Sequence, residues 1–215
     1  MNAAAVLRGW RAPALVAAAL SLAVGAWFLA RPAPQIEERR ADAARLMNEL
    51  MSGKVPVGGP FTLADPRGKS VSLADFRGKV VLLYFGFMSC PDVCPTDLLA
   101  IGKTIEALAA DGEKVQPLFI TLDPARDTGE GLRSYVTSFH PRFVALTGGE
   151  ADVRRVATDY KVFFEKVQIP GTTTYTIDHA AFTFVLDREG RYVAFLPPGT
   201  PPERMAVMLR EQLQR

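Results

Sequence analysis

The sequence predicts an α/β domain in which helices flank a mixed β-sheet, preceded by one membrane-spanning helix. Two continuous apolar runs, Lys79–Phe87 and Val115–Leu122, have the β-branched and aromatic content of strands buried on both faces. Segments with helical spacing alternate with these runs, and that order of elements is typical of an α/β sandwich. Residues 57–215 are numerous enough to form one domain with its own core.

The first 30 residues predict a membrane anchor. Residues 12–30 form an apolar run without a charge, and about 20 such residues cross a bilayer as a helix. Arg8 and Arg11 precede the run, so the positive-inside rule places residues 1–11 in the cytoplasm and the remainder outside. The alternative is a signal peptide cleaved near Ala26, and both alternatives export the domain. Because no Arg- and Ser-rich transit peptide precedes the run, we expect a bacterial inner membrane, with the domain in the periplasm.

Residues 31–56 are predicted to link the anchor to the domain. They begin with a proline-rich, extended stretch, and the helical spacing of Glu37–Met51 then predicts a stalk helix. From residue 31 onward the chain holds 23 basic and 23 acidic residues, so it carries no net charge. This balance argues against nucleic acid as a partner, since phosphate binding requires a basic surface.

Within the domain, a short hairpin is predicted first, at Phe61–Ala64 and Ser70–Leu73, because a turn signal at 65–68 separates two alternating runs. The strand Lys79–Phe87 follows it. The later elements are predicted from the spacing of apolar residues: helices at 96–110, 131–139, 151–160 and 203–214, and strands at 115–122, 143–146, 181–186 and 192–195.

The chain has only two cysteines, Cys90 and Cys94, placed where the central strand ends and the next helix begins. Pro95 suits the first turn of a helix, and the N–H groups at a helix N-terminus stabilise a thiolate. Three interpretations compete: a structural disulfide, a redox dithiol and a metal site. A purely structural bridge is disfavoured because closing so short a loop removes little chain entropy. A metal site needs ligands beyond the two thiolates.

The two histidines help to separate these interpretations. His140 lies at the end of a predicted helix, where a cation is favoured, and we interpret it as structural. His179 lies just before the predicted strand 181–186. In a thioredoxin-like sheet the loop entering this strand faces the cysteine turn, and this chain offers an imidazole where a thioredoxin has a cis-proline.

Four stretches, in order, resemble the Sco/SenC family of copper-delivery proteins: FMSCPDVCPTDL at 87–98, FITLDPARDT at 119–128, FHPRFVALTG at 139–148 and IDHAAFTFVLDREG at 177–190. The resemblance runs from about residue 57 to the last helix and includes the single anchor. It implies a thioredoxin-like fold and one copper ion bound by Cys90, Cys94 and His179. It also implies delivery of the copper to the binuclear copper centre of cytochrome c oxidase subunit II, after loading by an upstream copper donor.

The ligand chemistry agrees with this resemblance. Two thiolates and an imidazole form a soft set that favours Cu(I); ligand type alone does not distinguish Cu(I) from zinc, and Cu(II) stays open as a second oxidation state. The third residue between the cysteines widens the turn, so the sulfurs can converge on a metal or close a redox-active disulfide. The alternative function is a thiol–disulfide reductase acting on the cysteines of the oxidase copper site, because the dithiol must be reduced before it binds Cu(I).

Three further features near the site are singled out. Asp178 is a candidate acceptor for the free N–H of the His179 imidazole, as carboxylates often are beside metal-bound histidines. The DPARD stretch at 123–127 matches a family motif and is assigned either to partner docking or to loop structure. Val162–Thr176 is expected to form a hairpin-like segment that covers the site or meets the oxidase.

Overall fold

The computed structural model describes residues 56–214, and Val57–Arg215 form one compact unit. The predicted anchor, and the linker up to residue 55, lie outside the described residues. No helix within 56–214 is long and apolar enough to cross a membrane.

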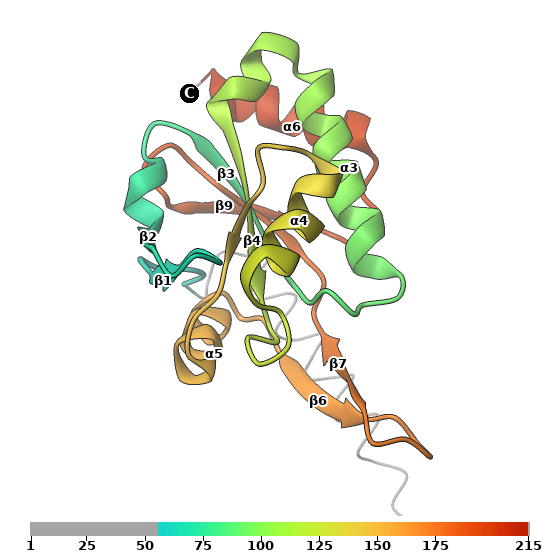
Figure 1. Cartoon of the computed structure of the whole chain (residues 1–215). Helices are drawn as coiled ribbons and strands as arrows, with labels where there is room; N and C mark the ends of the chain where they lie inside the picture. Colours follow the sequence, from blue (N-terminus) through green and yellow to red (C-terminus); the bar gives the residue numbers. More distant parts are fainter. Residues whose placement is uncertain (1–55, 215) are drawn as a thin grey trace, which may run out of the picture. The chain divides into compact units, whose positions relative to one another are not determined.

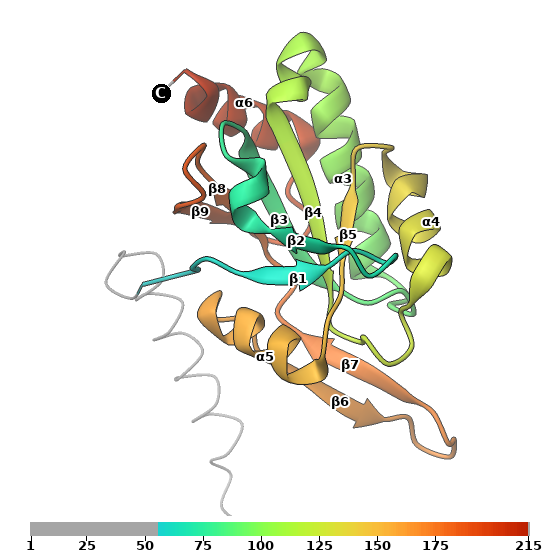
Figure 2. The same cartoon turned by 60° about the vertical axis from the view of Figure 1, so that its left-hand side comes forward.

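A five-stranded mixed sheet forms the centre of this unit (Figure 1), in the order β5-β4-β3-β8-β9 (Figure 2). The neighbours β3 (Val80–Gly86), β4 (Val115–Thr121) and β5 (Val144–Leu146) are parallel. On the other side of β3, β8 (Thr183–Leu186) and β9 (Tyr192–Leu196) continue the sheet antiparallel. Every residue of β3 and β4 is buried, because both faces of the sheet are covered. The predicted α/β class with a mixed central sheet is therefore confirmed.

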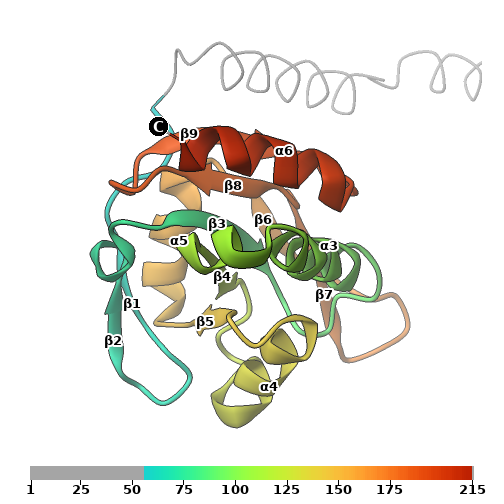
Figure 3. The same ribbon diagram turned by 90° about the horizontal axis from the view of Figure 1, so that it is seen from above.

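One face of the sheet is covered by α3 (Val93–Ala107), α4 (Gly129–Phe139) and α6 (Pro202–Leu213) (Figures 1 and 3). Their apolar residues share one core with alternate residues of β3 and β4, since successive side chains of a strand point to opposite faces. A 3-10 helix, η2 (Ala109–Lys114), connects α3 to β4.

The opposite face is covered by α5 (Glu150–Asp159) and by the N-terminal hairpin (Figure 2). That hairpin consists of β1 (Thr62–Ala64) and β2 (Ser70–Ser72) and leads into the 3-10 helix η1 (Leu73–Phe76). The second apolar core of the unit lies on this face. Each face therefore has its own core, as expected for a central sheet between two layers.

A further hairpin projects from the sheet (Figures 1 and 2). Its strands, β6 (Phe164–Gln168) and β7 (Tyr175–His179), pair antiparallel. The hairpin expected at 162–176 is present, but its second strand extends to His179. The prediction that His179 lies in a loop is therefore wrong: its position is held by strand pairing, opposite Phe164.

Candidate metal centre

The two cysteines lie on the connection from β3 into α3. This helix begins at Val93, three residues earlier than predicted, so Cys94 lies in its first turn. The backbone N–H of Cys94 donates to Sγ of Cys90 over 3.5 Å, and the N–H of Cys90 donates to the carbonyl of Phe87 over 3.2 Å. Both thiols are free; Cys94 is buried and Cys90 is half-buried. The predicted placement of the sulfurs at a helix N-terminus is confirmed.

His179 reaches the cysteines from the end of β7. Its Nε2 lies 3.5 Å from Sγ of Cys94, and its ring packs edge-on against Phe87 with 5.8 Å between the ring centroids. One potential ligand atom from each of Cys90, Cys94 and His179 lies within 4.8 Å of the others, and no other such group occurs among residues 56–214. The structure thus brings together the three side chains that the sequence analysis selected as metal ligands.

Asp178, in contrast, does not meet the imidazole. Neighbouring residues of a strand point to opposite faces, so Asp178 is exposed whereas Ile177 is buried and His179 is half-buried. Nδ1 of His179 is buried and has no hydrogen-bond partner within the described part of the chain. The hypothesis that Asp178 accepts the imidazole N–H is therefore not supported by this structure, because the two adjacent side chains lie on opposite faces of β7.

The two thiols differ strongly in acidity. A hydrogen bond from the Cys94 thiol is the main cause that lowers the pKa of Cys90 to about 4, and further hydrogen bonds from His179 and from backbone N–H groups act in the same direction. The same hydrogen bond and burial raise the pKa of Cys94 above its ordinary value. These opposite shifts favour a metal-free pair that holds one proton on Cys94, with Cys90 as the thiolate.

A buried polar pair supports the first turn of α3. Tyr84 is completely buried, and its hydroxyl donates to Oδ2 of Asp97 over 3.2 Å. Oδ1 of Asp97 accepts the N–H of Gly199 over 2.8 Å, and burial raises the pKa of this carboxyl group. The sequence analysis missed both residues. The helical spacing of Asp97 could have revealed it, because it falls on the buried stripe formed with Cys94, Leu98 and Ile101.

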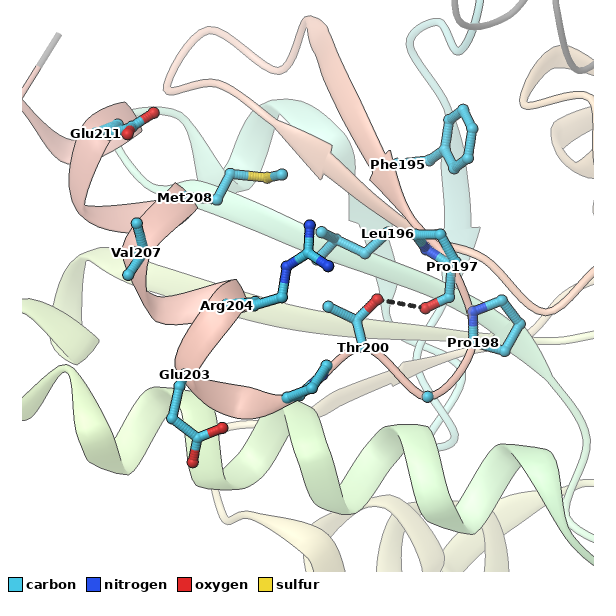
Figure 4. Close-up of a pocket in the computed structure, with 12 residues that line it drawn as sticks. Phe195, Leu196, Pro197, Pro198, Thr200, Glu203, Arg204, Val207, Met208 and Glu211 are labelled. Carbon is cyan, nitrogen blue, oxygen red and sulfur yellow. Dashed lines mark hydrogen bonds between the residues drawn. The ribbon is translucent and has the colours of Figure 1, made fainter.

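A cavity of about 730 Å³ lies elsewhere, between the end of β9 and α6 (Figure 4). Its lining includes Phe195, the loop 196–201 and the exposed face of α6. No cysteine or histidine lines it, so it offers no soft ligand set. Its connection to the cysteines is indirect, through the N–H that Gly199 donates to Asp97.

A thioredoxin-like domain that presents two cysteine thiols and one imidazole at a helix N-terminus defines a class of soft-metal or dithiol proteins. The chain belongs to the SCO1/SenC family, whose model matches residues 50–214. The SCO2-like protein RP587 of Rickettsia prowazekii is 43% identical over 145 residues, which cover 67% of this chain and 71% of that protein.

Solved structures agree with this assignment. The copper-bound ScoI of Bradyrhizobium japonicum is 39% identical, with a TM-score of 0.67, and the match covers 73% of this chain and 99% of that one. BsSco, described as a member of the Sco family of cytochrome c oxidase assembly proteins, shares the fold at 21% identity, with a TM-score of 0.57 and coverage of 73% and 92%. The resemblance to the Sco/SenC family is confirmed.

Proposed function

We propose that this chain is a membrane-anchored copper chaperone that binds one copper ion through Cys90, Cys94 and His179. The observation that carries the proposal is the convergence of two sulfurs and an imidazole nitrogen within 4.8 Å, on three segments that the fold holds in place. Such a set suits Cu(I). The copper-bound structure of the related ScoI from Bradyrhizobium japonicum supports the choice of copper over zinc.

The difference in acidity between the two thiols indicates the order in which they would bind an incoming copper ion. Cys90 is already a thiolate at neutral pH, so it is the first sulfur available to an incoming ion. Cys94 must release its proton as the metal binds, because the ligand is the thiolate. Binding of one Cu(I) to the reduced pair therefore releases about one proton near pH 7, and His179 completes the ligand set through Nε2.

Delivery requires ligand exchange with a recipient. Cys94 is buried, whereas Cys90 and His179 are half-buried, so incoming ligands would approach from the side of these two residues. We propose the binuclear copper centre of cytochrome c oxidase subunit II as the recipient and an upstream copper donor as the source. The description of BsSco as a cytochrome c oxidase assembly protein supports cytochrome c oxidase as the enzyme that receives the copper. The apolar run at 12–30 supports a membrane anchor, and Arg8 and Arg11 before it support a domain on the far side of the membrane, which we propose is the periplasmic side of a bacterial inner membrane.

The direct test is a competition titration with Cu(I). The full chain, purified in detergent with its thiols reduced, is titrated anaerobically against a chromogenic Cu(I) chelator. We expect one tight copper per chain and binding weakened by at least about 10-fold in His179→Ala. His140→Gln is the matched control, since His140 is the other histidine and lies outside the ligand group. Tight binding that is indifferent to His179→Ala would overturn the three-ligand proposal.

A second candidate is a thiol–disulfide reductase that acts on the cysteines of the oxidase copper site. It is favoured by the contrast between an acidic, half-buried Cys90 and a buried Cys94, because a low-pKa accessible thiolate is the nucleophile in disulfide exchange. The two candidate functions predict different effects of replacing His179. A reductase would keep its activity on a disulfide substrate in His179→Ala, whereas a copper chaperone would lose the ability to restore oxidase assembly at low copper.

A further inference from the structure

The DPARD stretch forms a buried polar network immediately after β4. Oδ2 of Asp127 accepts the hydroxyl of Thr121 over 2.7 Å and the backbone N–H of Met88 over 2.9 Å. The Thr121 hydroxyl in turn accepts the N–H of Asp123 over 2.9 Å. Asp127 is only 2% exposed, and Met88 lies two residues before Cys90. One end of the network therefore binds the backbone of the cysteine loop.

The other end of the network binds the hairpin. Oδ1 of Asp123 accepts the hydroxyl of Tyr175 over 2.8 Å, while Oδ2 accepts Nε of Arg126. Nη1 of Arg126 donates to the carbonyl of Tyr175 over 3.0 Å, and its guanidinium lies 3.8 Å from the centroid of the tyrosine ring. Asp123 is completely buried. Tyr175 is thus held through its hydroxyl, its ring and its carbonyl at once.

Tyr175 and His179 are the two ends of the same strand, β7. They are four residues apart, so they lie on the same face of the strand. The hairpin itself has few apolar contacts with the body: four of the five residues of β6 are exposed, and its buried members are Phe164 and Ile177. His179 is paired with Phe164 at its own end of β7, and the contacts of Tyr175 add a restraint at the other end of the strand.

We propose that Asp123, Arg126 and Tyr175 are positioning residues that hold the imidazole of His179 within reach of the two thiols. A single loop then connects both halves of the ligand set: Asp127 to the cysteine loop, and Asp123 with Arg126 to the strand that carries His179. This inference rests on the proposed function, since it assigns these residues to the same metal centre. The sequence left two roles open for the DPARD stretch, partner docking or loop structure. The proposal favours loop structure, with a role in positioning the site.

The test is Tyr175→Phe in the full chain. This change removes only the hydroxyl that Asp123 accepts and leaves the ring for Arg126. We expect Cu(I) affinity to fall by about 10-fold, and Cu(II)-loaded protein to show weaker imidazole nitrogen coupling in its electron paramagnetic resonance spectrum. In the His179→Ala background the same change should cost nothing further, because the hydroxyl acts through the imidazole. Gln168→Ala is the matched control: it removes two hydrogen bonds at the tip of the same hairpin, to the carbonyls of Thr172 and Thr174.

A second readout needs no copper. In the metal-free protein, Tyr175→Phe should accelerate amide hydrogen exchange over residues 175–179. Gln168→Ala should leave the exchange near His179, and at its pairing partner Phe164, as slow as in the wild type. Unchanged exchange and unchanged affinity in Tyr175→Phe would overturn the positioning role. An equal loss of affinity with and without His179 would overturn it as well. Failure of the proposed function would give a different result: the His179→Ala variant would bind Cu(I) as tightly as the wild type.

Discussion

Gly86 is the residue at which we expect one methyl group to disturb both the fold and the metal centre. A Cβ atom at this position would lie 2.9 Å from Sγ of Cys94 and 3.0 Å from ring carbons of Phe119 and Tyr84. All three neighbours are completely buried, so none of them can move into solvent. To reach an ordinary contact distance, the sulfur would have to shift by about 0.5 Å, which is more than metal coordination tolerates.

For Gly86→Ala we therefore expect two linked losses. Overpacking should lower the free energy of unfolding by about 2 kcal/mol, which corresponds to a Tm lower by roughly 4–8 °C in a chain of this size. Displacement of Cys94 should weaken Cu(I) binding by about 10-fold. Thermal unfolding of the metal-free protein and Cu(I) competition of the loaded protein measure the two effects separately.

Gly131→Ala provides the matched control in α4. Its nearest neighbour would be Cε of Met88 at 3.7 Å, an ordinary contact. Alanine also favours a helix over glycine, so this variant should be unchanged or more stable by up to about 1 kcal/mol, with normal copper affinity. If Gly86→Ala matched Gly131→Ala in both measurements, the argument from close packing around Cys94 would be refuted.

Two further predictions concern ionisation. Because the pKa of Cys90 is lowered to about 4, the rate at which iodoacetamide alkylates Cys90 in the folded, metal-free protein should stay nearly constant from pH 8 to pH 5 and decline near pH 4. Cys94 should stay unmodified over this range. A midpoint of the Cys90 rate near the ordinary pKa of 9.0 would contradict this prediction. Burial raises the pKa of Asp97, so ionising this carboxyl group destabilises the fold above its ordinary pKa of 3.8 and has no effect well below it. The Tm of the wild type relative to that of Asp97→Asn should accordingly rise as the pH is lowered from 7 through 3.8, because only the wild type loses this ionisation cost, and a Tm difference that does not change with pH would count against the reasoning.

The elements of the domain could be predicted because each depends on its own residues. Apolar runs and helical spacing located the strands and helices to within a few residues. The start of α3 was missed by three residues, because Val93 and Cys94 precede Pro95 and a proline is compatible with any position in the first turn. The hairpin at β6 and β7 was anticipated, but its length was not, since pairing between Phe164 and His179 depends on register across the turn.

The sequence by itself determined which residues are the candidate metal ligands and the local chemistry of the two cysteines. Two cysteines at the junction of a strand and a helix already imply an acidic thiol, because the N–H groups of the first helical turn follow directly along the chain. Likewise, His179 could be selected from only two histidines.

Only the tertiary structure decided which of these groups meet. His179 and Cys94 are 85 residues apart and become neighbours through the placement of β7. Asp178, adjacent to His179, is directed away by the alternation of side chains along a strand, whereas Asp123 is distant in sequence and contacts β7 through Tyr175. Local patterns arise from short-range sterics and hydrogen bonding, but contacts across 50 or more residues depend on how separate elements pack, and no single segment of the chain contains that information.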